Sequence, residues 1–100
     1  MKVTASSVAE IKATKFISSS DFVLLAKGVA GKKADVEIDG SASVAVFIDA
    51  AKTALKIDTG KVFADVIIKR GDFIVDKTKS LADNRISDGT SVTITFKIVV

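Results

Sequence analysis

The chain contains no cysteine, histidine, tryptophan, tyrosine or proline among its 100 residues. Without cysteine it can form neither a disulfide nor a thiolate metal site. Without histidine or cysteine it also lacks the side chains that most often act as general base or nucleophile. We therefore expect a protein that is not an enzyme and that carries no metal and no cofactor.

Long apolar runs are missing as well. No run is longer than that of Phe22–Ala26, which is far shorter than the roughly 20 residues that a membrane-spanning helix needs. Met1 and Lys2 are followed by Val-Thr-Ala-Ser-Ser, which does not have the apolar core of a signal peptide. We expect a cytoplasmic protein with no membrane contact.

Charge and aromatic content argue against nucleic acid as a partner. Fifteen Lys and Arg against twelve Asp and Glu give a net charge of +3, without a block of like charges. All six aromatic residues are phenylalanine, and four of them are needed in or beside a core: Phe22, Phe47, Phe73 and Phe96. Few rings remain for stacking on bases, and no motif indicates a small-molecule substrate.

The first 20 residues are interpreted as an N-terminal arm, separate from a domain at 21–100. Ser7 to Glu10 has the form of a helix capping box, and Ala13, Phe16 and Ile17 could share a helical face. Alternation around Ile11 fits a strand equally well, so the arm is left as helix, strand or disorder. The three serines at 18–20 resemble a linker.

From Asp21 onward the pattern predicts a first hairpin. Phe22, Leu24 and Ala26 alternate with Val23, Leu25 and Lys27, as expected of the two faces of a strand. Gly28-Val29-Ala30-Gly31 predicts a tight connection, because glycine adopts positive φ easily. Charged residues then alternate with apolar ones along Lys33–Asp39, which predicts a second strand with one solvated face.

A single helix is predicted over Ser43–Leu55. Ser43 is a suitable N-cap residue, and an apolar stripe recurs at helical spacing: Val44, Phe47, Ile48, Ala51 and Leu55. The polar triplet Asp58-Thr59-Gly60 should end this helix.

The rest of the chain predicts three more strands. They are Val62–Lys69, a short Phe73–Val75 after the turn Arg70-Gly71-Asp72, and a final strand in which Val92, Ile94 and Phe96 share a face. The order strand, strand, helix, strand, short strand, strand predicts an α+β fold. We expect a β-grasp architecture, with a mixed sheet of about five strands, one crossing helix and the N-terminal arm.

Residues 21–100 resemble the ubiquitin-like superfamily. Gly31-Lys32 matches the Gly-Lys of the family's first hairpin turn, and Leu81 and Ile86 have the spacing of the two side chains that plug its sheet. The chain is also similar to small bacterial ubiquitin-like proteins that have no conjugating tail. Because the sequence ends on Ile98-Val99-Val100 rather than on Gly-Gly, we expect neither a conjugated modifier nor a sulfur carrier.

The same resemblance places three apolar residues, Val23, Leu25 and Ile67, on the outer face of the sheet. Apolar side chains on a solvated face suggest a cover. The cover could be the arm, through Val8, Ile11, Phe16 or Ile17; it could be a partner or a second copy; or the exposure could be without meaning. The candidate protein-interaction residues are Val23, Leu25, Ile67, Phe16 and Ile17.

We therefore expect a non-catalytic protein–protein interaction module, similar to an adaptor. The alternative is a structural subunit of a larger assembly, such as a phage virion or a secretion apparatus, joined to other copies through its N-terminal arm.

Overall fold

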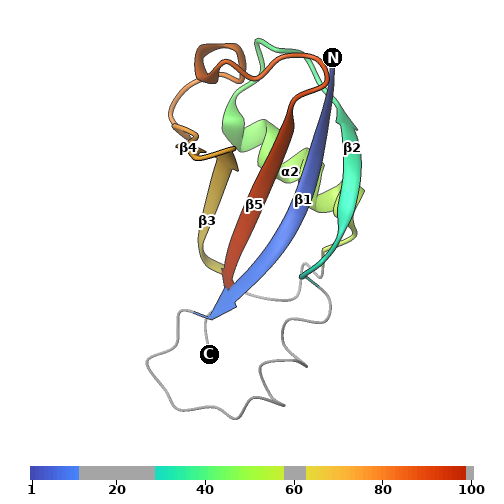
Figure 1. Cartoon of the computed structure of the whole chain (residues 1–100), viewed down its shortest axis with the longest axis vertical. Coiled ribbons are helices and arrows are strands. Elements are labelled where there is room, and N and C mark those ends of the chain that lie inside the picture. Colours follow the sequence, from blue (N-terminus) through green and yellow to red (C-terminus); the bar gives the residue numbers. More distant parts are fainter. Residues whose placement is uncertain (12–28, 58–62, 99–100) are drawn as a thin grey trace.

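The structure is a computed structural model, and it describes residues 1–11, 29–57 and 63–98 (Figure 1). The described secondary structure comprises five strands, one α-helix and one 3-10 helix. In chain order these are β1 (Lys2–Ile11), β2 (Lys33–Glu37), α2 (Val44–Leu55), β3 (Phe63–Arg70), β4 (Phe73–Ile74), η1 (Ala82–Asn84) and β5 (Ser91–Ile98).

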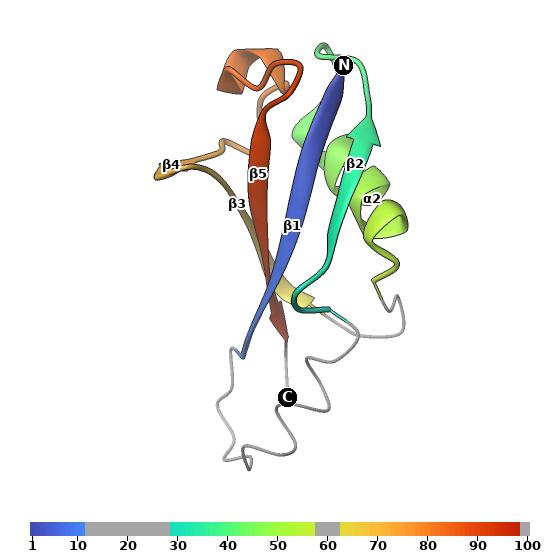
Figure 2. The ribbon, with the colours of Figure 1, turned by 45° about the vertical axis from the view of Figure 1, so that its right-hand side comes forward.

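The five strands form one mixed sheet in the order β2-β1-β5-β3-β4. Strands β1 and β5 at its centre are parallel, whereas the pairs β1–β2, β3–β5 and β3–β4 are antiparallel. Helix α2 lies across one face of this sheet (Figure 2). The chain therefore has an α+β fold with a five-stranded mixed sheet and one helix, compatible with a β-grasp-like fold, and this confirms the predicted fold class.

The structure corrects the interpretation of the N-terminal arm. Residues 2–11 form β1, which pairs with β2 on one side and with β5 on the other. They belong to the centre of the sheet rather than to a separate arm, and their conformation is strand rather than helix. The remainder of the expected arm and the expected strand Phe22–Lys27 lie outside the described residues.

Strand β1 is buried by its position more than by its own hydrophobicity. Its inward side chains are small, with Val3 and Ala5 fully buried. Ser7 also faces inward; its Oγ donates to Val29 O at 2.5 Å and accepts from Lys32 N at 3.0 Å. Because a buried hydroxyl needs such partners, Ser7 fixes the start of the segment that leads into β2.

Helix α2 forms as predicted. The Ser43 Oγ accepts a hydrogen bond from Val46 N at 3.2 Å, which satisfies one of the free N–H groups of the first turn. The inward stripe is buried at Val44, Phe47, Ala51 and Leu55, and Ile48 is half-buried. The helix ends at Leu55, where Lys56 adopts the left-handed conformation with φ 55°; the expected stop at 58–60 lies outside the described residues.

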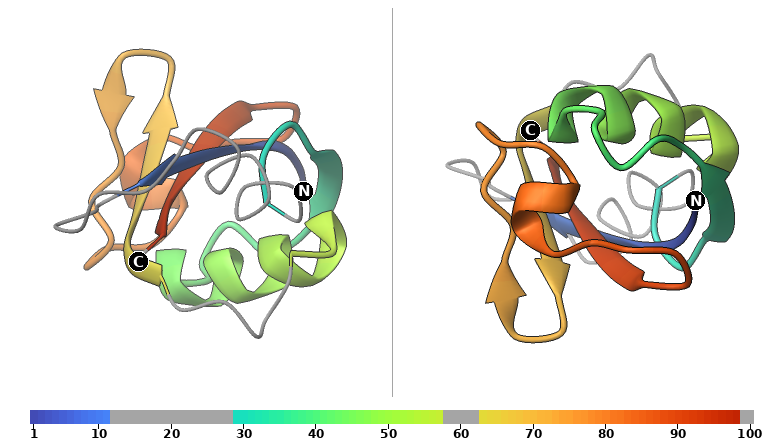
Figure 3. Two further views of the ribbon diagram at one scale, coloured as in Figure 1. Left: turned by 90° about the horizontal axis from the view of Figure 1, so that it is seen from below. Right: turned by 90° about the horizontal axis from the view of Figure 1, so that it is seen from above.

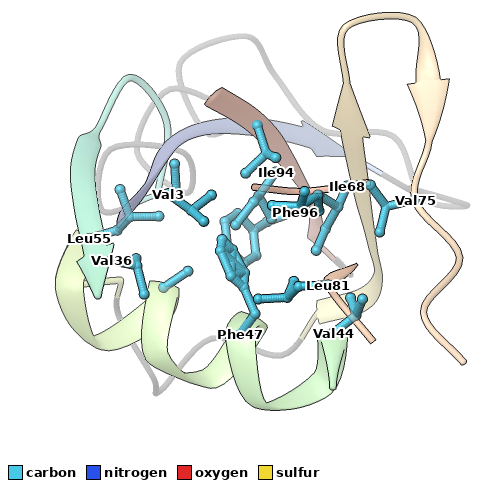
Figure 4. Close-up of a cluster of buried hydrophobic side chains, with 14 of the residues drawn as sticks. Val3, Val36, Val44, Phe47, Leu55, Ile68, Val75, Leu81, Ile94 and Phe96 are labelled. Atoms are coloured by element: carbon cyan, nitrogen blue, oxygen red, sulfur yellow. The ribbon is translucent and has the colours of Figure 1, made fainter. Parts of the chain in front are cut away.

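The core fills the space between α2 and the sheet (Figure 4). Phe47 of the helix packs in the same buried cluster as Ile94 and Phe96 of β5. Leu81 and Ile86, from the segment before β5, are also buried, as predicted for the two residues that plug the sheet. Burying a large apolar side chain completely contributes about 1.5–3 kcal/mol.

Within the three described ranges, no helix is long and apolar enough to cross a membrane.

Candidate interaction surface

The part of the chain that the structure describes encloses no pocket and brings no group of three or more acidic side chains together. The candidate site is therefore a surface. Two faces of the sheet differ in kind, because α2 packs on one of them (Figure 2). We call the opposite face the outer face.

The outer face carries every second residue of each strand, since side chains alternate across a sheet. On β5, Val92, Ile94 and Phe96 are buried toward the helix, so the residues between them point outward. The same alternation applies to the other strands. The outer residues are Lys2, Thr4, Ser6, Val8 and Glu10 on β1, Lys33, Asp35 and Glu37 on β2, Ile67 and Lys69 on β3, Ile74 on β4, and Ser91, Thr93, Thr95 and Lys97 on β5.

Apolar side chains line up across the strands of this face. Thr95 pairs with Val8 on one side and with Ile67 on the other. Ile74 pairs with Lys69, which places Ile74 diagonally across from Ile67. With strands about 4.8 Å apart, three apolar residues, Val8, Ile67 and Ile74, form one band together with Thr95, which lies between Val8 and Ile67; we call these four residues the outer apolar band.

The outer apolar band is largely open to solvent. Val8 is 44% exposed and Ile74 is 62% exposed, whereas Ile67 and Thr95 are half-buried. Charged groups border the band: Lys33 and Lys69 lie in the same row as Ile74, and Glu10 and Lys97 occupy the row on the other side of Val8 and Thr95. An apolar centre with a charged border is the usual composition of a protein-binding surface.

The β3–β4 hairpin extends this surface away from α2 (Figure 3). Its loop is the two-residue turn Gly71-Asp72, and Gly71 has φ +60°, the conformation that a tight hairpin with glycine at the first loop position requires. Phe73 next to the turn is 49% exposed, and the Arg70 guanidinium lies 5.2 Å from its ring centroid. This cation–π contact holds the base of the turn together.

The candidate residues from the sequence fall into two groups. The structure places Ile67 on the outer face, as the sequence predicted. Val23, Leu25, Phe16 and Ile17 lie outside the described residues, so their role stays a prediction. Val29, from the segment predicted as a tight connection, is fully buried and takes no part in this surface.

Sequence reasoning missed two members of the outer apolar band as surface residues. Val8 was considered only as part of an arm, although small inward side chains alternate along residues 2–10 with outward ones that are polar except at Val8. Ile74 was placed in the short fourth strand without an assignment to a face. For Ile74, the signal was the two-residue glycine turn, which pairs it with Lys69.

Comparison of the sequence with models of known protein families gives no match, and comparison with curated proteins finds no significant relative. Function is therefore inferred from the geometry of the surface.

Proposed function

We propose that this chain is a non-catalytic protein–protein interaction module of the ubiquitin-like kind, which docks onto a partner protein through its outer sheet face. The observation that carries the proposal is the outer apolar band, in which Val8, Thr95 and Ile67 lie side by side across three strands. Exposed apolar patches on a solvated face are characteristic of interaction sites.

Burial of the band would supply most of the binding energy. A large apolar side chain contributes about 1.5–3 kcal/mol when it passes from full exposure to full burial. Ile74 and Val8 have the most area left to bury. The lysines at the border of the band would raise the association rate toward an acidic partner and add little to affinity.

The alternative function is a structural subunit of an assembly such as a virion or a secretion apparatus. In the form expected from the sequence, the N-terminal arm would reach onto a neighbouring copy. Residues 2–11 pair instead with β2 and β5 of the same chain, so an exchange would have to use residues 12–20, which lie outside the described residues. The outer face supports the interaction module more directly.

The test is affinity capture followed by reconstitution. Val8→Asp and Ile67→Asp should each abolish capture of a protein that the unmodified chain retains, and should reduce its affinity at least 10-fold when that protein is purified and titrated. A 10-fold loss corresponds to about 1.4 kcal/mol, less than the expected contribution of one buried apolar side chain.

Val46→Asp is the matched control. Val46 is 54% exposed on α2, so the same change of chemistry is made away from the outer face. Circular dichroism melts should show all three variants folded. Equal binding by Val8→Asp, Ile67→Asp and the unmodified chain would refute the proposal, and so would an equal loss in Val46→Asp.

A further inference from the structure

The two edges of the sheet differ in how their backbone groups are protected. At the β4 edge, the strand has only two residues. Beyond it, Asp76 N donates to Asn84 Oδ1 at 2.8 Å, and Lys77 Nζ donates to Val66 O at 2.7 Å. A very short edge strand and a lysine side chain at the edge are devices that keep an edge from pairing with another chain.

The β2 edge carries Lys33, but its strand is longer, with five residues against two in β4. Its pairing with β1 is continuous from Lys2↔Glu37 to Ser6↔Lys33, without a bulge. It contains no proline, and the charges it carries all lie on the outer face. No described strand pairs with its far side, as Figure 1 shows.

The hydrogen bonds to β1 fix which β2 groups face outward from the sheet. Met1 and Ile38 exchange two hydrogen bonds, at 3.0 and 2.9 Å, and Ser7 N donates to Lys32 O at 2.8 Å. In an antiparallel ladder every second residue bonds to the same neighbour. The even-numbered residues 32–38 therefore face β1, and the N–H and C=O groups of Lys33, Asp35 and Glu37 point to the open edge.

We propose that the open edge of β2 pairs with β2 of a second copy of this chain, antiparallel and about a two-fold axis at Asp35. Along the edge the exposed side chains read positive, negative, negative. In this register Lys33 of each copy lies opposite Glu37 of the other copy, so the same charge pair forms twice. Opposite charges facing each other across strands are stabilising.

Neighbouring registers fit less well. The register about Asp35 uses all three outward residues, and each hydrogen-bonded pair of an antiparallel ladder exchanges two bonds. A two-fold axis at Ala34 leaves Glu37 opposite the turn at Gly31, where φ is +73°, so one pair is lost. An axis at Val36 sets Asp35 against Glu37, which repel.

The axis at Asp35 has one unfavourable contact, since two Asp35 carboxylates meet on it. In the chain itself Asp35 Oδ1 accepts from Thr4 Oγ1 at 2.8 Å, which leaves the carboxylate exposed on the outer face. This repulsion and the small contact area make the pairing weak and reversible, in the range of transient interfaces. Because the axis is perpendicular to the sheet, both outer faces lie on the same side of the pair.

The self-pairing is independent of the proposed docking of a partner on the outer face, and sedimentation equilibrium of the full chain tests it. The mass should rise from 10.5 kDa toward twice that value between about 10 μM and about 1 mM, the range for a small interface. Lys33→Glu and Glu37→Lys should each hold the chain monomeric, and the double variant should restore the pairing. Asp35→Asn should tighten it several-fold.

Lys69→Glu is the matched control, because it makes the same charge change on the outer face of β3 and should leave the pairing intact. In amide exchange, the N–H groups of Lys33, Asp35 and Glu37 should become protected as concentration rises, while those of Ala34 and Val36 stay unchanged. Val8→Asp should not alter the rise of the sedimentation-equilibrium mass with concentration.

Three results would overturn the proposal: a monomer at about 1 mM and low salt, where a weak interface still populates its complex; folded single variants whose double variant fails to pair; or loss of association in Val8→Asp. The last result would assign the self-association to the outer face instead. A failure of partner capture by the outer face would leave the edge pairing untouched.

Discussion

Asn84 and Asp76 hold each other by two hydrogen bonds. Asp76 N donates to Asn84 Oδ1 at 2.8 Å, and Asn84 Nδ2 donates to Asp76 O at 3.0 Å. The same Nδ2 group donates to Ser80 O at 2.8 Å. Asn84 is only 2% exposed, so its amide is satisfied by the backbone of the segment that it closes. That segment carries Leu81 into the core.

Replacing this amide should destabilise the fold. Asn84→Ala removes three hydrogen bonds and leaves Asp76 N–H without its acceptor. An unsatisfied buried group costs about 1–3 kcal/mol, so we expect a loss of about 2–4 kcal/mol in the free energy of unfolding. Urea titration measures it. Ser87→Ala, at an exposed position of the following turn, should change stability by less than about 0.5 kcal/mol.

Leu81 is the second test of the same segment. Its side chain is fully buried, in the cluster that also contains Val44 and Phe47. Leu81→Ala should cost about 2–5 kcal/mol, the range for large-to-small changes in a core. Val46→Ala on the exposed side of α2 is the control, and it should be nearly neutral. A loss below about 1 kcal/mol would show that Leu81 does not plug the sheet.

The helix and the C-terminal half could be predicted because their signals are local. Ser43 and the stripe from Val44 to Leu55 define the helix by capping and periodicity alone. Gly71 fixes the β3–β4 turn by its positive φ. Each of these features depends on residues within a few positions of one another, so a local sequence pattern is enough to predict it.

Strand β1 could not be predicted in the same way. Its inward row contains Ala5 and Ser7, and Ser7 is buried only because Val29 O and Lys32 N supply partners. That environment is set by residues more than 20 positions away. The first strand was predicted at Phe22–Lys27, because that segment begins with the strongly apolar run Phe22–Ala26. Placing β1 required the pairing with β2 and β5, which no local pattern reveals.

The candidate surface was affected by the same error. Ile67 was assigned to the outer face from the resemblance, and the pairing of Ile67 with Thr95 agrees with that assignment. Val8 acquires its place beside Thr95 only when β1 is recognised as a central strand. A surface that is assembled from four strands depends on their register, and one misplaced strand removes one of its four residues.

Acid should weaken the fold through two loop carboxylates. The Ser41 backbone N–H and then its hydroxyl donate to Asp39 and lower the pKa of that carboxyl below its ordinary value of 3.8. The Thr78 hydroxyl and then its N–H lower the pKa of Asp76 in the same way. Because the folded pKa lies below the unfolded one, the stabilisation is fully present above the ordinary value and is lost as pH falls through the lowered one.

Urea titrations at several pH values measure this dependence. The free energy of unfolding should decline as pH falls below about 4. Asp39→Asn and Asp76→Asn keep an oxygen acceptor but no longer titrate, so each should make that decline shallower. Carboxyl chemical shifts followed by NMR should show both groups titrating below the ordinary value. An unchanged slope in both variants would assign the acid sensitivity to other carboxylates.

Lys56 stops α2 in a conformation that suits glycine better than lysine. Its φ is 55°, and its N–H donates to the carbonyls of Lys52 and Thr53. A left-handed conformation costs a residue with a side chain about 1–2 kcal/mol, whereas glycine adopts it freely at a somewhat greater loss of chain entropy. Lys56→Gly keeps the N–H bonds and the Lys56 carbonyl that accepts from Lys32 Nζ. We therefore expect a gain of about 0.5–1 kcal/mol in the free energy of unfolding, measured by urea titration.

Lys56→Val should destabilise the fold, because a β-branched side chain tolerates this φ least. Stabilisation by valine would show that the left-handed turn is not what ends the helix.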